Sequence, residues 1–250
     1  MHGFGYGYLK LDFLFAAAVQ GRRYDENLTR AQTLRRGLEA IRRGAGPETF
    51  IVGCGCPLGP AIGIVDGMRI GPDVAPYWGA DVEPGAGLAI KAIIARSFMH
   101  RRLWLNDPDC VLLRVRETRL SHEERFALAA AIAVSGGMLL VSDDVSLLNA
   151  ESQSLFALAA GIGIDVDSGS GHEPLIAEDL MRSEPIQALV GQGAGSTFRL
   201  LLNLGEITKH ISMPSNPSVG RRATLIGPDG AHEAPEKISL PPHSGRIIRF

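Results

Sequence analysis

The sequence predicts an α/β fold in which a parallel sheet with covering helices is followed by a small antiparallel β-domain. Strand-like and helix-like segments alternate over about the first 160 residues, which is the pattern of a parallel sheet. Past about residue 166, short β-prone runs separated by glycine, proline and asparagine replace that alternation. The predicted organisation is a β/α part over residues 1–165, a linker over 166–182 and the β-domain over 183–250.

Five strands are expected in the first part, at residues 7–14, 50–53, 67–70, 103–105 and 138–141. Two of the helices begin with capping boxes, in which a Ser or Thr side chain and a Glu or Gln three residues later bond to backbone N–H groups. The helices are expected from the box Thr29–Gln32 to Gly44, over 86–99, from the box Ser121–Glu124 to about 134, and over 147–160. A sheet of five strands can stay open, whereas a closed barrel of this type needs eight.

Turn residues mark the connector and the strands after it. The stretch Asp165–Gly171 is rich in aspartate, serine and glycine, and we expect a turn-rich connector there. Short strands are then expected at 187–190, 197–203, 207–211, 223–226 and 246–250. Runs of this length with such turns between them predict antiparallel pairing.

Composition excludes several classes of protein. The chain has 250 residues, of which 45% are hydrophobic, enough for a sizeable core in one or two domains. A net charge of −2 gives no reason to expect nucleic acid or an anionic membrane as a partner. Three cysteines are too few for a disulfide framework, and neither a signal peptide nor an apolar run of about 20 residues is present. We therefore expect a cytoplasmic protein.

The segment Tyr8–Phe13 predicts a carboxylate at the C-terminal end of a strand. Lys10 lies two residues before Asp12, so both side chains point to the same face of that strand. A buried pair of this kind is costly unless it is paired or used, and the lysine would hold Asp12 ionised, as a nucleophile requires. The alternative is that Asp12 bonds only to backbone amides of the next loop.

A second carboxylate, Asp73, follows the strand expected at 67–70. Carboxylates at the C-terminal ends of two strands of one β/α chain can face each other across the same site. Two such carboxyl groups are the least that is needed to hydrolyse a glycosidic bond with retention of configuration. Arg69 suits contacts to sugar hydroxyls or a carboxylate, or an internal ion pair. Asp73 could instead cap a turn, and Asp66 precedes the strand and should lie nearer the opposite face.

Other polar residues have simpler interpretations. Cys54 and Cys56 lack the further ligands that a metal site needs, so no metal is expected and Cys54 is interpreted as a small buried group that lines the site. Asn106, Asp107 and Asp109 are expected to make local turn and cap bonds. The pair Asp143 and Asp144 is expected to cap the next helix, and the two tryptophans belong to the core or stack on a sugar.

Six segments form a recognisable set, namely Lys10–Phe15, Gly53–Leu58, Asp66–Asp73, Phe98–His100, Trp104–Cys110 and Ser142–Asp144. In this order they resemble α-galactosidases (melibiases) of glycoside hydrolase family 36, over roughly residues 5–150. The resemblance is nearest to the bacterial type with the motif seen here at Gly67–Asp73. It implies a (β/α)8 TIM-barrel glycosidase, of which this chain would hold the C-terminal part, about strands 4–8, followed by a small antiparallel β-domain.

The resemblance also implies roles for single residues. Asp12, at the end of the fourth barrel strand, corresponds to the nucleophile that forms a covalent β-galactosyl intermediate. Asp73, after the sixth strand, corresponds to the general acid/base. Lys10, Cys54 and Arg69 match positions that contact galactose, and no metal or organic cofactor is implied. The expected activity is hydrolysis of terminal α-D-galactosyl residues from melibiose- or raffinose-type oligosaccharides.

One departure from the family leaves alternatives open. The N-terminal β-domain and three barrel strands that precede the strand with Asp12 in the family have no counterpart here, so the chain is expected to be an N-terminally truncated fragment. An inactive remnant, a carbohydrate-binding or assembly module, and a related retaining enzyme such as an α-N-acetylgalactosaminidase are the alternatives. A homo-oligomer could cover the open sheet edges. A nucleotide-binding sheet is excluded, because no Gly-x-Gly-x-x-Gly or P-loop follows the first strand.

Overall fold

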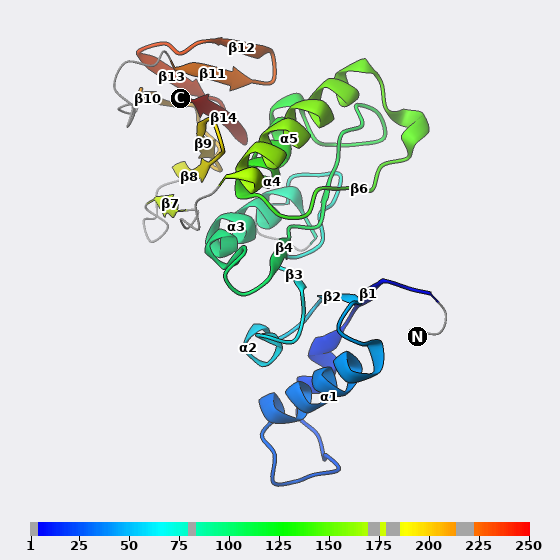
Figure 1. The fold of residues 1–250 in the computed structure, drawn as a ribbon. Coiled ribbons are helices and arrows are strands. Elements are labelled where there is room, and N and C mark those ends of the chain that lie inside the picture. The colour runs from blue at the N-terminus through cyan, green and yellow to red at the C-terminus, as the bar shows by residue number, and fades with distance from the viewer. Residues whose placement is uncertain (1–4, 80–83, 170–175, 179–185, 214–222) are drawn as a thin grey trace. The chain divides into compact units, whose positions relative to one another are not determined.

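The computed structural model describes residues 5–79, 84–169, 176–178, 186–213 and 223–250 (Figure 1). They fall into two compact units. The first unit lies within Met1–Arg69 and Arg101–Asp107, and the second within Ile70–His100 and Pro108–Phe250. The predicted boundary between the β/α part and the β-domain falls inside the second unit, and the domain limits stay a prediction.

A four-stranded sheet organises the first unit. Its strands are β1 (Tyr8–Leu11), β2 (Phe50–Gly53), β3 (Gly67–Arg69) and β4 (Leu105–Asp107). They pair in the order β1-β2-β3-β4, and every pair is parallel, as the alternating pattern predicts. Because all four strands run the same way, the residues at their C-terminal ends meet at one edge of the sheet.

Helix α1 (Arg30–Ala45) forms for the local reasons visible in the sequence. Thr29 and Gln32 make the predicted capping box, and the apolar side chains of Leu34 and Leu38 are buried. Its last turn presents Arg42, which donates to the carbonyl of Thr49 at 2.6 Å and forms an ion pair with Asp66. Asp66 also accepts the N–H of Ile51, so it supports the start of β3 and not the C-terminal edge. The short helix α2 (Leu58–Ala61) follows β2.

The second unit is built from three helices and an antiparallel sheet (Figure 1). The helices are α3 (Ala86–Arg96), α4 (His122–Ser135) and α5 (Ala150–Ser168). The strands are β5 (Cys110–Val111), β6 (Leu140–Val141), β7 (Ile176–Glu178), β8 (Ile186–Gln192), β9 (Thr197–Asn203), β10 (Lys209–Ser212), β11 (Thr224–Gly227), β12 (Gly230–Glu233), β13 (Lys237–Leu240) and β14 (Ser244–Arg249). Six of them pair in the order β12-β11-β14-β9-β8-β7, all antiparallel as predicted, while β10 pairs with β13 and β5 pairs with β6.

Helix α4 is the centre of the second unit. It opens with the predicted capping box of Ser121 and Glu124, and almost every later residue is buried, five of them alanines. These small side chains let α3, α5, β9 and β14 pack directly against it. At Gly245 of β14 a Cβ atom would lie only 3.2 Å from the Cα of Ala127, so glycine is needed for this approach.

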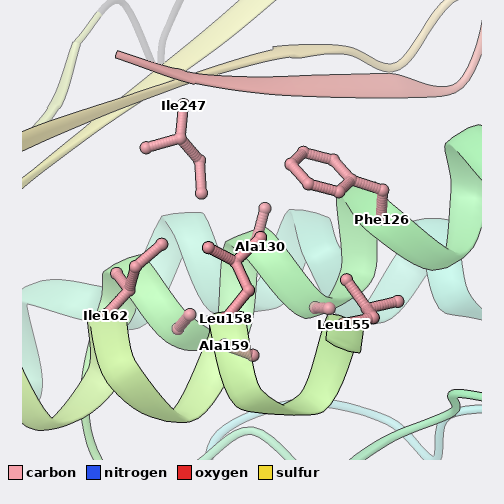
Figure 2. A pocket seen from close by; sticks show the side chains of 9 residues that line it. Phe126, Ala130, Leu155, Leu158, Ala159, Ile162 and Ile247 are labelled. Carbon is pink, nitrogen blue, oxygen red and sulfur yellow. The ribbon is translucent and has the colours of Figure 1, made fainter. Parts of the chain in front are cut away.

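The centre of the contact between α4, α5 and β14 is apolar. Figure 2 shows Phe126 and Ala130 of α4, Leu158 and Ile162 of α5, and Ile247 of β14 converging on one narrow pocket. The pocket leaves no space for a water molecule. It is therefore part of the packed core and not a ligand site.

Several predicted boundaries differ from the structure. The strand expected at 103–105 begins at Leu105 as β4, and the chain pairs again as β5 after a break at Asp109, which has a φ of 79°. The strand expected at 138–141 is reduced to β6, which pairs with β5 outside the four-stranded sheet. After β1, the last residues of the strand expected at 7–14 form a 3-10 helix at Leu14–Ala18.

The connector expected at Asp165–Gly171 is wrong in its first half. Helix α5 continues to Ser168, because Ile162 and Val166, four residues apart, are both buried against the core. Asp165 and Asp167 bond outside their own helix, to Ala194 and to Gly137. In the expected linker at 166–182, β7 is also formed, while residues 170–175 and 179–182 lie outside the described part of the chain.

Membrane insertion finds no support in the helices. Among the residues that the structure describes, none forms a helix with both the length and the hydropathy of a membrane span.

Candidate active site

Four polar residues stand in a row at the C-terminal edge of the four-stranded sheet. Asp12 and Cys54 directly follow β1 and β2, and Arg69 and Asp107 are the last residues of β3 and β4. The row follows from the register, in which Leu11 pairs with Gly53, Gly53 with Met68, and Arg69 with Asp107. Neighbouring residues in such a row belong to adjacent strands, so a negative, a neutral, a positive and a negative group follow one another.

Asp12 is exposed, and its surroundings favour the carboxylate. The backbone N–H of Phe13 donates to Oδ1 at 2.7 Å, and this bond is the largest cause of a lowered pKa. A hydrogen bond from the Cys54 thiol and the positive charges of Lys10 and Arg69 lower the pKa further. The charge of Lys10 thus acts on Asp12, but both side chains are exposed, so the expectation of a buried pair is wrong.

Cys54 is held as a neutral thiol. Its side chain is buried, and burial together with the hydrogen bond to Asp12 raises the pKa of Cys54 to about 11. Burial also raises the pKa of Cys56 to about 11. A thiol that is protonated at neutral pH is a poor nucleophile and a poor metal ligand. The chemistry therefore favours Cys54 as a hydrogen-bond donor that lines the site.

Arg69 and Asp107 form the buried end of the row. Nε of Arg69 lies 3.4 Å from Oδ2 of Asp107, and the two side chains are only 5% and 1% exposed. Buried charges need partners, so each residue fixes the other in place. The partner of Asp107 in this ion pair lies on the neighbouring strand, a contact that the sequence does not predict.

Tyr8 is a residue of this face that the sequence did not reveal. It lies two and four residues before Lys10 and Asp12, so it shares their face of β1. Its ring stacks on Phe50 with 5.7 Å between centroids. Burial raises the pKa of Tyr8, and the charge of Asp107 adds to this. Only its place at the start of the segment Tyr8–Phe13 could have indicated it.

The backbone beside Asp12 is strained. Phe13 has a φ of 54°, a left-handed conformation that is unusual for a bulky side chain and costs of order 1–3 kcal/mol. It is held by the turn after β2, because the carbonyl of Gly55 accepts the N–H of Phe15 at 2.6 Å. The strained residue directly follows Asp12, and its N–H is the one that donates to Oδ1 of Asp12.

Asp73 lies in the second unit, in the loop after β3, and is exposed. Its carbonyl accepts the N–H of Gly85 at 3.1 Å, and the next residue, Val74, donates its N–H to Oδ2 of Asp109 at 2.7 Å. Asp109 thus bonds to a loop 35 residues away in the sequence. Asp73 and Asp12 are in different units, and their joint action stays a prediction.

The last two carboxylates divide the expected capping role. Asp144 caps the 3-10 helix Val145–Leu147 through the N–H of Ser146, and the hydrogen bonds from Ser146 lower the pKa of Asp144. Asp143 instead accepts the N–H of Leu113 at 2.5 Å and faces Arg114 at 3.4 Å. Asp144 therefore caps the short 3-10 helix, whereas the helix expected at 147–160, which is α5, is capped by Asn149, and capping by Asp143 is wrong.

The described residues contain no candidate metal centre. No group of three or more His, Cys, Asp or Glu side chains there is arranged to hold a metal ion. This edge of the sheet can therefore present one ionised carboxylate, that of Asp12, beside Arg69, the Cys54 thiol and Lys10 of β1.

Comparison with solved structures finds glycosidases. α-Galactosidase I from Mortierella vinacea matches with a TM-score of 0.73 at 17% identity, over 100% of this chain and 68% of that one. The α-galactosidase TtGalA from Thermus thermophilus, solved with stachyose, matches with a TM-score of 0.54 at 33% identity, over 63% of this chain and 35% of that one. A GH27 β-L-arabinopyranosidase from Geobacillus stearothermophilus matches with a TM-score of 0.67 at 14% identity, over 99% of this chain and 58% of that one. No protein-family model matches the chain.

These likenesses show the fold. The neighbours are TIM-barrel glycosidases with a C-terminal β-domain, and this chain has a partial α/β fold followed by an antiparallel sheet. The chain spans only part of each neighbour, 35% in the case of the Thermus enzyme.

Proposed function

We propose that the chain is the C-terminal part of a retaining α-galactosidase of the family 36 type. The observation that carries the proposal is the row at the sheet edge, in which Asp12 is kept ionised by a backbone N–H, a thiol and two cations. An ionised, accessible carboxylate at the C-terminal end of a parallel strand is what a glycosidase nucleophile needs. The resemblance of six sequence segments and the 33% identity to the Thermus enzyme support the same activity.

The proposed reaction has two steps. Asp12 attacks the anomeric carbon of a terminal α-D-galactosyl residue and forms a β-linked ester, while Asp73 protonates the departing glycosidic oxygen. Asp73 then takes a proton from water, which attacks the same carbon and releases galactose with its configuration retained. Neither step calls for a metal or an organic cofactor.

The other residues of the row would bind the sugar. Lys10 and Arg69 are cationic donors on the face of Asp12, and a guanidinium held by Asp107 cannot turn away from a hydroxyl that it binds. The thiol of Cys54 would stay protonated and keep Asp12 oriented. The substrates we propose are α-galactosides of the raffinose type, such as the stachyose that accompanies the Thermus enzyme.

The compartment belongs to the same proposal. Cys54 and Cys56 form no disulfide bond in the structure, and Cys54 is buried. Free buried thiols persist in a reducing environment, so we propose the cytoplasm.

The test is hydrolysis of an aryl α-galactoside by this chain, its Asp12→Asn variant and the control Asp229→Asn. Asp229 is an exposed aspartate far from the row in sequence, so its loss should leave the rate unchanged. We expect release of the aryl group by the parent and the control, and a loss of at least about 1,000-fold in Asp12→Asn. α-Galactose should be the first product seen by NMR.

A slow fluorinated galactosyl donor adds a second readout. It should raise the intact mass of the parent by one sugar, attached at Asp12. A folded parent that neither hydrolyses the substrate nor gains the sugar would contradict the proposal for this chain and favour a sugar-binding module, which galactose titration would then detect.

A further inference from the structure

The loop that carries Asp73 is stacked onto the C-terminal strands through one tryptophan. Trp78, five residues after Asp73, is 9% exposed, and its ring lies on the imidazole of His243 with 4.5 Å between centroids and 16° between planes. Its buried indole nitrogen has no hydrogen-bond partner among the described residues. The orientation of the Trp78 ring therefore depends on packing, and the imidazole face is one of the surfaces on which it packs.

His243 is itself held by two carboxylates. Its Nδ1 lies 2.9 Å from Oε1 of Glu124, and its Nε2 lies 2.9 Å from Oε1 of Glu206. Each ring nitrogen therefore lies within hydrogen-bond distance of one carboxylate oxygen. Glu124 is rigid, because its other oxygen accepts the N–H of Ser121 in the capping box of α4. The imidazole is thus fixed before it meets Trp78.

The backbone at His243 supports the same arrangement. Its φ is 52°, in the left-handed region where His, Asn and Asp occur more often than other side chains. His243 lies in the turn between β13 and β14, and β14 packs on α4. The turn therefore aims the imidazole from the C-terminal strands back at the Asp73 loop.

The part of the loop between Asp73 and Trp78 is held by further contacts. Val74 donates to Asp109, and the carbonyl of Pro76 accepts the N–H of Arg119 at 2.8 Å. The guanidinium of Arg119 also lies over the ring of Tyr77, 4.8 Å from its centroid. Trp78 follows Tyr77 in the sequence, and its side chain is held by His243, which belongs to the C-terminal strands.

We propose that His243 is a positioning residue for Asp73, which it orients through the Trp78 ring. The proposal rests on the acid/base role of Asp73 proposed above. A general acid must reach the leaving oxygen within hydrogen-bond distance, and small displacements of such a group are costly. The C-terminal β-strands would then contribute directly to proton transfer, and not only to stability.

The kinetic test compares two leaving groups in the parent, in His243→Asn and in His232→Asn. Asparagine tolerates the left-handed backbone at position 243, and His232 is exposed on β12, so the control carries the same change away from the loop. A dinitrophenyl galactoside needs no protonation to leave, whereas a methyl galactoside does. We expect kcat/KM for the methyl galactoside to fall about 10- to 100-fold in His243→Asn, with less than about a 3-fold change for the dinitrophenyl one.

A second readout does not need activity. In a Trp104→Phe background the tryptophan fluorescence comes from Trp78. The emission maximum should shift, and acrylamide should quench the fluorescence more strongly, in His243→Asn but not in His232→Asn. Unchanged emission overturns the proposal, as does an equal loss on both galactosides. If the parent cleaves neither galactoside, the proposed function fails for this chain, while the emission still decides whether His243 holds the loop.

Discussion

The ionisation of Asp12 depends in part on Cys54 and Arg69, which are its neighbours only in the folded sheet. We predict that Cys54→Ala raises the pKa of Asp12, because the thiol hydrogen bond favours the carboxylate. A carboxylate with a lowered pKa stabilises the fold above its unfolded-state pKa, and this contribution is lost as the pH falls through the lower, folded value. In Cys54→Ala that contribution should be smaller, and its loss should be complete at a higher pH.

Carboxyl-carbon NMR of the parent, Cys54→Ala and Cys54→Ser measures this directly. Serine keeps a hydroxyl donor at position 54, so its Asp12 should titrate close to the parent value. The acid limb of the pH profile for hydrolysis should move upward in the alanine variant alone. An Asp12 that titrates identically in all three proteins would rule out the thiol as a donor.

The residues of this row were predictable to different degrees. Asp12 and Lys10 share a strand, so their common face follows from a period of two residues. The partnership of Arg69 and Asp107 joins residues that are far apart in the sequence, and it exists only because β3 and β4 are adjacent. The segment Asn106–Asp109 looks like a turn locally, and nothing local distinguishes a buried aspartate from a turn aspartate.

At the scale of single elements, local chemistry decides where a helix starts. We predict that Thr29→Ala lowers the free energy of unfolding by about 1 kcal/mol, since the capping box of α1 loses its side-chain acceptor. Gly37→Ala in the same helix should raise it by about 0.5–1 kcal/mol, because Gly37 is exposed and a Cβ there meets nothing within 4 Å. Urea unfolding of both variants and the double variant checks this, and effects of the same sign would contradict it.

Helix and strand ends that no capping residue marks were harder to predict. The capping boxes of α1 and α4 gave their first residues, whereas the last turns of α5 contain Gly161 and Gly163 and look like the start of a connector. Those turns are helical because Ile162 and Val166 are buried against the core. The strands β12 and β13 were not predicted, because they are short and, in β12, exposed throughout.

At the scale of the molecule, the second unit joins segments that the sequence pattern assigns to different parts. Arg246 of β14 forms a two-pronged ion pair with Glu123 at the start of α4, with N–O distances of 2.6 and 2.7 Å. Helix α4 covers the sheet that the pattern assigns to a separate β-domain. The sequence pattern predicts whether each part is α/β or antiparallel β. It does not predict which helix packs on which face of a sheet, because many apolar surfaces could pair with one another.

We therefore predict that α4 and the C-terminal sheet unfold together. Phe126 is 1% exposed and lies between α4, α5 and Ile247 of β14 (Figure 2), so Phe126→Ala should lower the free energy of unfolding by about 3–5 kcal/mol. Phe156→Ala on α5 removes the same side chain from a site that is 38% exposed and should cost about 1 kcal/mol. In hydrogen exchange, Phe126→Ala should speed exchange in α4 and in β9 and β14 by similar factors, because one cooperative unit opens as a whole. Faster exchange confined to α4, with β9 and β14 as protected as in Phe156→Ala, would show that the sheet is stable without the helix that covers it.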